Sequence, residues 1–170
     1  MGTGKSCVGR LAADLLRFTF LDTDKVIEAR AGKIITRIFE EEGEPAFRQW
    51  EKRIVEELTR RKQTVIATGG GLPAGESNLA SLKSHALVVC LWAGPEKIWE
   101  RVRDHSHRPL LNEGDPLEKI RRLLAEREPY YRQADVLVNT ELRSLREVAI
   151  QVIHQFHMAR ATPAKIAERR

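Results

Sequence analysis

The first residues of the chain have the types and spacing of a phosphate-binding loop. Gly2, Thr3, Gly4, Lys5 and Ser6 match the end of the motif G-x-x-x-x-G-K-[ST] and run directly into a helical pattern. The glycines let backbone N–H groups curl around a phosphate, and the helix N-terminus adds positive potential. Lys5 is then expected to reach the β- and γ-phosphates of a nucleotide, and the Ser6 hydroxyl to hold Mg²⁺. A glycine-rich helix cap is the weaker alternative.

The loop motif is incomplete at its start. Its first glycine would fall five places before Gly4, ahead of residue 1, and so would the strand that delivers such a loop. That strand is central in P-loop folds, so its loss would leave two neighbouring strands without a hydrogen-bond partner. We therefore expect residues upstream of Met1, with Met1 an internal methionine; a strandless variant is the costlier alternative.

Two carboxylates follow a short apolar run. Asp22 and Asp24 come directly after residues 18–21, which read as a buried strand. Carboxylates at the carboxyl end of a parallel strand point into the crevice where α/β sheets bind ligands. One can hold Mg²⁺ through water, and the other can accept a hydroxyl proton during phosphoryl transfer. The alternative is that one of them caps the next helix, and we expect one to do so in addition.

Three consecutive glycines follow a second apolar run. Gly69, Gly70 and Gly71 come after residues 64–67. Because each glycine loses much conformational freedom on folding, such a run indicates backbone lying directly against a ligand. A flexible turn is a credible alternative when the glycines are considered alone.

The elements that must position these residues alternate along the chain. Compact apolar runs predict four strands buried in a parallel sheet, at residues 18–21, 64–67, 86–91 and 136–139. Amphipathic patterns predict six helices, at residues 5–16, 24–31, 44–61, 96–102, 117–131 and 144–157. Strand–helix alternation within one domain predicts a three-layer α/β fold with right-handed crossovers.

Composition excludes several classes of protein. With 170 residues, 42% of them hydrophobic and 31% charged, the chain is neither disordered nor too short for a single core. No apolar run approaches the roughly 20 residues of a membrane helix, and no export signal opens the chain. The two cysteines, Cys7 and Cys90, are too few for a disulfide framework, so we expect a cytoplasmic protein.

The net charge of +5 suits small anionic ligands such as nucleotides at least as well as nucleic acid. The basic residues form no long runs and have no interleaved aromatic surface on which bases could stack. We therefore expect neither a nucleic acid nor a membrane as partner.

Six motifs together resemble the shikimate kinase family in their order and spacing. They are MGTGKS at 1–6, FLDTD at 20–24, IFEEEGEPAFR at 38–48, TGGG at 68–71, RPLL at 108–111 and REPYY at 127–131. The resemblance covers essentially the whole chain up to about residue 160. The loop fragment alone would indicate only a P-loop nucleotide-binding protein, and the other motifs make the resemblance specific.

This resemblance implies a P-loop kinase fold with sheet order 2-3-1-4-5, of which this chain lacks the first, central strand. It also implies a mobile lid at about 103–116 and ATP-dependent phosphorylation of the shikimate 3-hydroxyl, with Mg²⁺ as cofactor. The kinase domain would occupy residues 1–160 and a basic tail residues 161–170. We expect a monomer that binds ATP and shikimate.

Matching motifs imply the roles of single residues. Asp24 would bind the shikimate hydroxyls and act as, or orient, the base, while Arg48 and Arg127 clamp the carboxylate and Gly70 and Gly71 pack against the ring. Lys5 and Arg108 join Asp24 as catalytic residues, and Ser6 and Asp22 lie at the metal. The implied ATP-binding residues are Gly2, Thr3, Gly4, Lys5, Ser6, Cys7, Arg101 and Arg108.

Guanidinium groups suit the carboxylate role because two parallel hydrogen bonds fix a carboxylate's orientation. The alternatives are surface ion pairs, of Arg48 with Glu51 and of Arg127 with Glu126 or Glu128.

One position departs from the family pattern. Cys7 stands where threonine is common, and a thiol is a poor donor to a phosphate; we expect it packed and inert.

Other functions remain as alternatives. A non-catalytic nucleotide-binding relative would account for the missing strand and Cys7, and a kinase of another small metabolite would share the scaffold. The third alternative is a basic module that binds nucleic acid.

Overall fold

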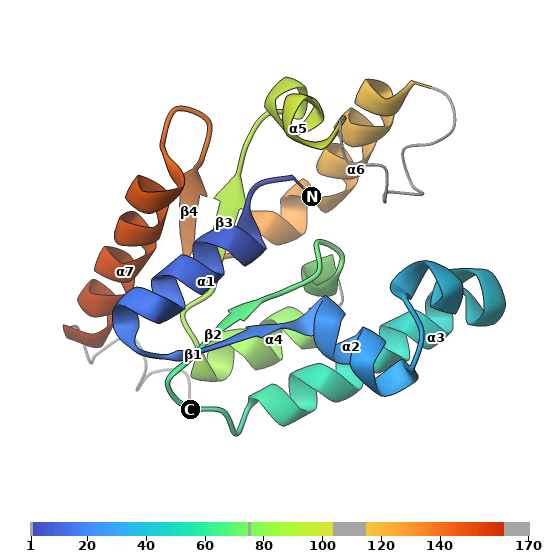
Figure 1. Ribbon diagram of the computed structural model, residues 1–170, viewed down its shortest axis with the longest axis horizontal. Coiled ribbons are helices and arrows are strands. Elements are labelled where there is room, and N and C mark those ends of the chain that lie inside the picture. The colour runs from blue at the N-terminus through green and yellow to red at the C-terminus, as the bar shows by residue number, and fades with distance from the viewer. Residues whose placement is uncertain (1, 75, 104–114, 162–170) are drawn as a thin grey trace.

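The computed structural model of the chain describes residues 2–74, 76–103 and 115–161 (Figure 1). Most of the lid expected at 103–116, including Arg108 and the motif at 108–111, lies outside these ranges, as do residues 162–170 of the expected tail. The described part folds as α/β, in agreement with the sequence pattern.

Four short strands form two parallel pairs. β1 (Thr19–Asp22) pairs with β2 (Thr64–Ala67), Thr19 lying opposite Thr64, and β3 (Val89–Trp92) pairs with β4 (Val136–Asn139), Val89 lying opposite Val136. All four predicted strands are therefore confirmed, but β3 begins three residues later than expected. The reason is that the Ala86 N–H still donates to the Leu82 carbonyl, which extends the preceding helix.

The two pairs do not join into one sheet. Among the described residues no strand lies between β2 and β3, so the order β1-β2 and the order β3-β4 stay separate. The sheet order 2-3-1-4-5, which the resemblance implies, has its central strand at this position.

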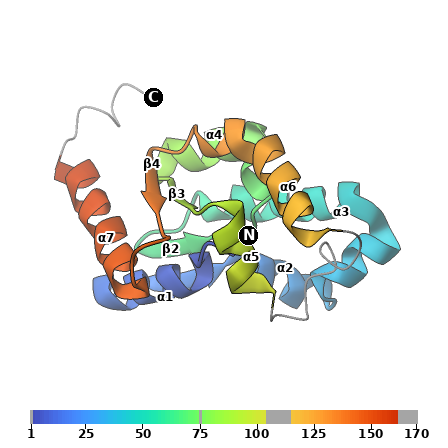
Figure 2. The ribbon, with the colours of Figure 1, turned by 90° about the horizontal axis from the view of Figure 1, so that it is seen from above.

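Helices cover both faces of the strands. Figure 2 shows α1 and α7 on one side and α4 and α6 on the other. The helices are α1 (Lys5–Leu16), α2 (Thr23–Ala31), α3 (Ile35–Leu58), α4 (Glu76–His85), α5 (Pro95–Val102), α6 (Pro116–Tyr131) and α7 (Leu145–Ala161), with a 3₁₀ turn η1 (Leu72–Ala74). In the described part of the chain, none of them is long and apolar enough to cross a membrane.

α3 consists of two helical stretches joined by a kink. Gly43 has φ 80° and ψ 173°, a conformation that residues with a side chain rarely adopt, and Pro45 follows it. The helix predicted from residue 44 corresponds to the second stretch, which ends at Leu58 instead of residue 61. The stretch before the kink and all of α4 were not predicted.

α1 is the element that carries the phosphate-loop residues. Its apolar face, with Val8 and Ala12, packs in one core cluster with Val138 of β4 and with Val148 and Ala149 of α7. This packing fixes the direction of α1, so that its N-terminus, with Lys5 and Ser6, lies beside the carboxyl ends of the strands (Figure 1).

Candidate active site

Glycines shape the N-terminus of α1. Gly2 and Gly4 both have positive φ, 67° and 86°, and Gly4 is the N-cap residue. Because glycine has no side chain, Gly4 cannot cap the first-turn N–H groups as serine or aspartate would. The first turn also contains no acidic residue. An N-terminus of this kind is suited to bind an anion such as a phosphate.

Ser6 and Asp22 meet beside this N-terminus. The Ser6 Oγ donates to Asp22 Oδ2 over 2.6 Å, although the two residues come from α1 and the end of β1. The other Asp22 oxygen accepts from the backbone N–H of Asp24 at 3.1 Å and so caps α2. Asp22 therefore does both things that the sequence left open, capping a helix and facing the phosphate loop.

Asp24 lies in the first turn of α2 and faces the glycine run. Its Oδ1 atom is buried and has no hydrogen-bond partner among the described residues. Burial raises the pKa of the Asp24 carboxyl, the neighbouring charge of Asp22 raises it further, and Lys5 acts in the opposite direction. The carboxylate of Asp24 is thus a better proton acceptor than an exposed aspartate.

The glycine run is held against α2 by a side chain. The backbone N–H of Gly69 donates to the Thr23 Oγ1 at 3.1 Å, and Thr23 is fully buried. A Cβ at residue 69 would come within 2.6 Å of Asp24 Oδ1. Glycine is therefore required at residue 69 for Asp24 to keep its position.

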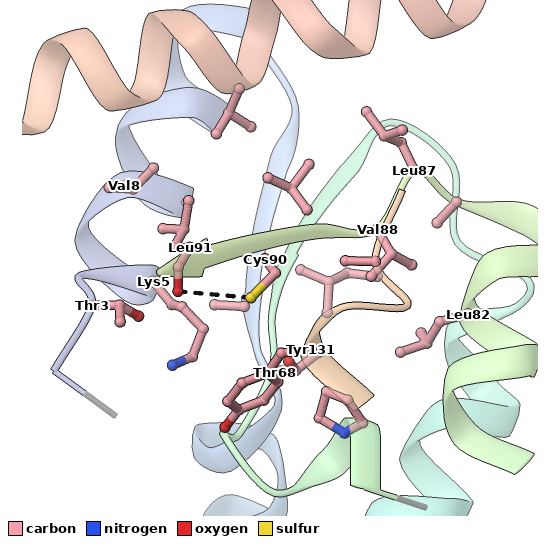
Figure 3. A pocket seen from close by; sticks show the side chains of 18 of the residues that line it. Thr3, Lys5, Val8, Thr68, Leu82, Leu87, Val88, Cys90, Leu91 and Tyr131 are labelled. Carbon is pink, nitrogen blue, oxygen red and sulfur yellow. Dashed lines mark hydrogen bonds between the residues drawn. The ribbon is translucent and has the colours of Figure 1, made fainter. Parts of the chain in front are cut away.

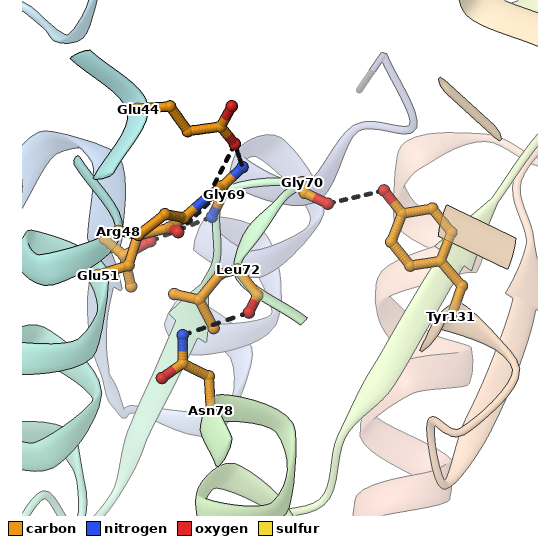
Figure 4. A network of polar contacts seen from close by, with 9 residues as sticks. Glu44, Arg48, Glu51, Gly69, Gly70, Leu72, Asn78 and Tyr131 are labelled. Atoms are coloured by element: carbon orange, nitrogen blue, oxygen red, sulfur yellow. Dashed lines mark hydrogen bonds and ion pairs between the residues drawn. The ribbon is translucent and has the colours of Figure 1, made fainter. Parts of the chain in front are cut away.

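Arg48 approaches the same run from α3 (Figure 4). Its Nη1 donates to Glu51 Oε2 and its Nη2 to Glu44 Oε1, each over 2.6 Å. A Cβ at Gly71 would lie 2.7 Å from Arg48 Nη1. The local ion pair that was the alternative for Arg48 is present, and the guanidinium also lies against the glycine run.

Glu51 is the buried partner in this group. Its side chain is 1% exposed, and its second oxygen, Oε1, has no hydrogen-bond partner in the described part of the chain. Burial raises the pKa of the Glu51 carboxyl, whereas Arg48 lowers it. Because a buried carboxylate needs a nearby cation, Glu51 holds Arg48 in place.

α6 brings Tyr131 to the other side of the glycine run, and Arg127 lies one turn earlier on the same helix. The Tyr131 hydroxyl donates to the Gly70 carbonyl over 2.7 Å (Figure 4). Arg127 lies near enough for its charge to lower the pKa of both Tyr131 and Glu51, against the effect of burial. The charges of Arg48 and Arg127, which are 79 positions apart in the sequence, therefore both act on the Glu51 carboxyl.

The described residues combine a helix end suited to bind an anion with Asp24, Arg48 and the buried Glu51, which are grouped around a glycine run. The family model for shikimate kinase matches residues 1–157. The chain belongs to the shikimate kinase family. This membership makes it an enzyme, a kinase that phosphorylates shikimate with ATP.

Individual relatives of the kinase agree with this assignment. This chain is 44% identical to the shikimate kinase of Caldanaerobacter subterraneus, over 92% of this chain and 91% of that protein. Its structure is similar to that of shikimate kinase from Acinetobacter baumannii in complex with shikimate, with a TM-score of 0.89, 39% identity and coverage of 95% and 91% of the two chains. For the enzyme from Aquifex aeolicus the TM-score is 0.80, with 36% identity and 92% coverage of both chains.

The remaining predicted ATP-binding residues lie in different places. Arg101, on α5, donates through Nη1 and Nη2 to the hydroxyl and the carbonyl of Thr140, at 2.9 and 2.6 Å, and so fixes the loop after β4. Thr3 is buried. Cys7 is exposed, so the expectation of a packed thiol is wrong: its side chain lies on the solvent side of α1. Arg108 lies outside the described residues.

Ser6 and Asp22 fit a magnesium ion by their chemistry. Both offer oxygen atoms, which Mg²⁺ prefers, and they already lie in contact with each other. Mg²⁺ in kinases keeps several waters and phosphate oxygens, so it needs only one or two protein ligands. The described residues accordingly contain no cluster of three or more histidine, cysteine, aspartate or glutamate side chains that could enclose a metal by themselves.

Three site residues of the kinase were not among the predicted ones. Thr23 is the middle residue of the D-T-D motif, and Tyr131 closes the motif at 127–131, so both were visible in the sequence without a stated role. Glu51 was considered only as a surface partner of Arg48. The signal that could have found it is the spacing of three from Arg48 on the apolar side of the helix, where Ile54 and Leu58 also lie.

Proposed function

We propose that the kinase transfers the γ-phosphate of ATP to the 3-hydroxyl of shikimate with Asp24 as the proton acceptor. The observation that carries this assignment is the half-buried Asp24 carboxyl beside the glycine run, whose Oδ1 atom is buried and whose pKa is raised. The hydroxyl proton passes to Asp24, the hydroxyl oxygen bonds to the γ-phosphorus, and the bond from that phosphorus to ADP breaks.

Binding of shikimate rests on the two arginines and the glycine backbone. Arg48 presents a guanidinium group held by Glu51 and Glu44, and a fork of this kind can form two parallel hydrogen bonds with a carboxylate. Arg127 adds a second positive charge from α6. Gly70 and Gly71 leave room for the ring because neither has a side chain, and they hold the substrate at the distance Asp24 requires.

The phosphate end is assigned to the start of α1. Lys5 and the backbone N–H groups after Gly4 neutralise the phosphates, with Gly2, Thr3 and Cys7 lining the loop and Arg101 on the nucleotide side. Ser6 and Asp22 would hold Mg²⁺, which supplies further neutralisation of phosphate charge when bound. Arg108 would act on the phosphates from the lid. Positioning and charge account for most of the rate, because phosphoryl transfer requires little covalent help.

The test is ADP release by the 170-residue chain with ATP and Mg²⁺, with and without shikimate. Release that depends strictly on shikimate, and is absent with gluconate as a matched polyol acid, supports the proposal. Shikimate-independent release, or equal release with gluconate, would contradict the assigned substrate. Asp24→Asn should abolish turnover in the same assay while the chain still binds ATP.

We also propose that the kinase acts in the cytoplasm as a monomer, without nucleic acid or membrane. Two unpaired cysteines, Cys7 and Cys90, support a reducing compartment. Light scattering coupled to size-exclusion chromatography tests whether the kinase is a monomer. A mass near 19.4 kDa is expected, and twice that mass would contradict the proposed monomer.

A further inference from the structure

The Thr23 hydroxyl begins to act where the pairing of β1 with β2 ends. The last paired residues of these two strands are Asp22 and Ala67, because the chain turns into α2 at Thr23. A helix cannot continue the ladder of a strand, so the two segments have no further backbone pairing. The Thr23 Oγ1 accepts from the Gly69 N–H at 3.1 Å. A side chain thus extends the connection between the two segments beyond the end of the sheet.

This hydrogen bond is enclosed within the protein. Thr23 is 0% exposed, and Gly69 is buried as well. A buried polar group without a partner costs free energy, because it has lost its hydrogen bonds to water. Threonine at residue 23 therefore provides what an apolar residue of the same shape could not, an acceptor for the Gly69 N–H.

The turn of α2 that carries Thr23 also carries the proposed base. Asp24 is the next residue, and its Oδ1 lies so close to Gly69 that a Cβ there would be 2.6 Å away. This oxygen has no hydrogen-bond partner of its own among the described residues. Its position relative to the glycine run therefore depends on how the run is held, and Thr23 holds it.

Two further polar contacts reach the glycine run from other helices (Figure 4). The Tyr131 hydroxyl, from α6, donates to the Gly70 carbonyl at 2.7 Å. Arg48, from α3, lies against Gly71. Neither contact joins the run to α2, so neither sets the distance between the run and the base.

The glycine run also borders the space in front of the phosphate loop. Gly69 and Gly70 line one cavity together with Lys5 and Tyr131 (Figure 3). In the proposed function the run lies against the shikimate ring, and Lys5 neutralises the phosphates. A shift of the run would therefore displace the substrate from the base and from the phosphates at the same time.

We propose that Thr23 is a positioning residue for phosphoryl transfer, which holds the glycine run, and with it the substrate, at a fixed distance from Asp24. Thr23 acts through the Gly69 N–H and has no contact with the substrate in this assignment. The inference rests on the proposed role of Asp24 as the proton acceptor. Because a displacement of about 1 Å between reacting groups costs about 100-fold in rate, loss of the hydroxyl should lower kcat more than it weakens binding.

The test compares two substitutions of Thr23 in the complete chain. Thr23→Val removes the hydroxyl and keeps the shape of the side chain. Its kcat should fall about 10- to 100-fold, with the KM for ATP unchanged within about twofold and the KM for shikimate raised less than kcat falls. Thr23→Ser keeps the acceptor oxygen, so it should lower kcat by no more than about threefold. Equal losses of kcat in both variants, or an unchanged kcat in Thr23→Val, overturn the proposal.

Thr59→Val is the matched control. The Thr59 hydroxyl also bonds to the main chain, donating to the Glu56 carbonyl at 2.7 Å, but it does so at the exposed end of α3. Its removal should change neither kcat nor either KM. A fall in kcat equal to that of Thr23→Val would mean that any lost hydroxyl slows the kinase, and it would overturn the specific role of Thr23.

A third variant keeps the proposal testable if Thr23→Val folds poorly. Urea unfolding gives the folded fraction of each variant, and kcat is expressed per folded chain. In Thr23→Ala the smaller side chain leaves space for a water, which can satisfy the Gly69 N–H but does not tie the run to α2. Per folded chain, kcat of Thr23→Ser should exceed that of Thr23→Ala at least about tenfold. Equal values would show that the hydroxyl contributes to stability alone, and they would overturn the proposal.

Asp24→Asn, measured in the same assay, separates this inference from the proposed function. An inactive Asp24→Asn chain together with an unaffected Thr23→Val chain overturns the positioning role of Thr23 alone. An Asp24→Asn chain with the original kcat overturns the role of Asp24 as the proton acceptor and, with it, the inference about Thr23.

Discussion

The carboxylate of Asp24 and the backbone of Gly69 lie so close together that no side chain fits between them. A Cβ at residue 69 would stand 2.6 Å from Asp24 Oδ1, which is nearer than real Cβ contacts come. The Thr23 hydroxyl fixes this approach by accepting from the Gly69 N–H. The position of the proposed base thus depends on a glycine 45 residues further along the chain.

Gly69→Ala should therefore disable the kinase without unfolding it. The added methyl group must push Asp24 or the glycine run aside, and a displacement of about 1 Å at a reacting group costs about 100-fold in rate. We expect kcat/KM for shikimate to fall by about that factor. The control is Gly32→Ala, where a Cβ meets nothing within 4 Å but φ is +64°. This variant should lose stability by about 1 kcal/mol and keep its activity. Equal activity of the two variants would contradict the role of Gly69.

Arg48→Ala should weaken the binding of shikimate and also lower the stability of the fold. Loss of charged hydrogen bonds predicts a KM for shikimate raised roughly 10- to 100-fold, with the KM for ATP nearly unchanged. Buried Glu51 loses its cation, which costs about 2 to 3 kcal/mol, less than for a fully buried pair because Arg48 is 36% exposed. Steady-state kinetics and urea unfolding measure the two effects.

A double variant separates those effects. Adding Glu51→Gln to Arg48→Ala removes the stranded charge, so stability should partly recover while the KM for shikimate stays high. If the KM for shikimate returned to its original value together with the stability, Arg48 would have a structural role only.

The fall in rate at low pH should report the protonation of the Asp24 carboxylate. Because burial and Asp22 raise its pKa, Asp24 becomes protonated at a higher pH than an ordinary aspartate, whose pKa is about 3.9. kcat/KM should therefore fall, as pH is lowered, with a midpoint above that value. In Asp22→Asn the neighbouring charge is gone, and the midpoint should move to lower pH even if the rate is reduced throughout. A midpoint that does not move, or that rises, would contradict this electrostatic coupling.

Tyr131→Phe should loosen the glycine run. The change removes the hydrogen bond to the Gly70 carbonyl and costs about 1 kcal/mol of unfolding free energy. Because Gly70 is proposed to lie against the shikimate ring, the KM for shikimate should rise severalfold, with kcat changed less. Tyr130→Phe is the matched control one residue earlier, and it should change neither quantity. Chemical denaturation and steady-state kinetics provide the comparison.

Lys5→Ala should abolish phosphoryl transfer while the shikimate pocket stays intact. Removal of this charge at the phosphates should lower kcat by about 100-fold or more. Lys25→Ala is the control, since Lys25 is exposed and paired with Glu28 on α2. It should retain kcat. Calorimetry should give the same shikimate affinity for both variants, and a near-native kcat for Lys5→Ala would refute its role.

Most elements could be predicted because their patterns are local. α1 shows its apolar face in a single stretch of sequence, and all four strands are short branched runs. α4 was missed because its apolar stripe is weak, with Leu79 and Leu82 as its buried hydrophobic residues among those described. The first half of α3 was missed because Gly43 and Pro45 interrupt the pattern.

Residue types and spacing alone determined the chemistry of this protein: a phosphate loop, a carboxylate pair, a glycine run and arginines that suit a carboxylate. Tertiary structure decided which of these meet. Arg48 and Tyr131 come to one glycine run from two helices. Burial, which sets the pKa of Asp24 and of Glu51, is a property of all the elements packed around a group. Local sequence cannot report it, because the atoms that exclude water come from distant parts of the chain.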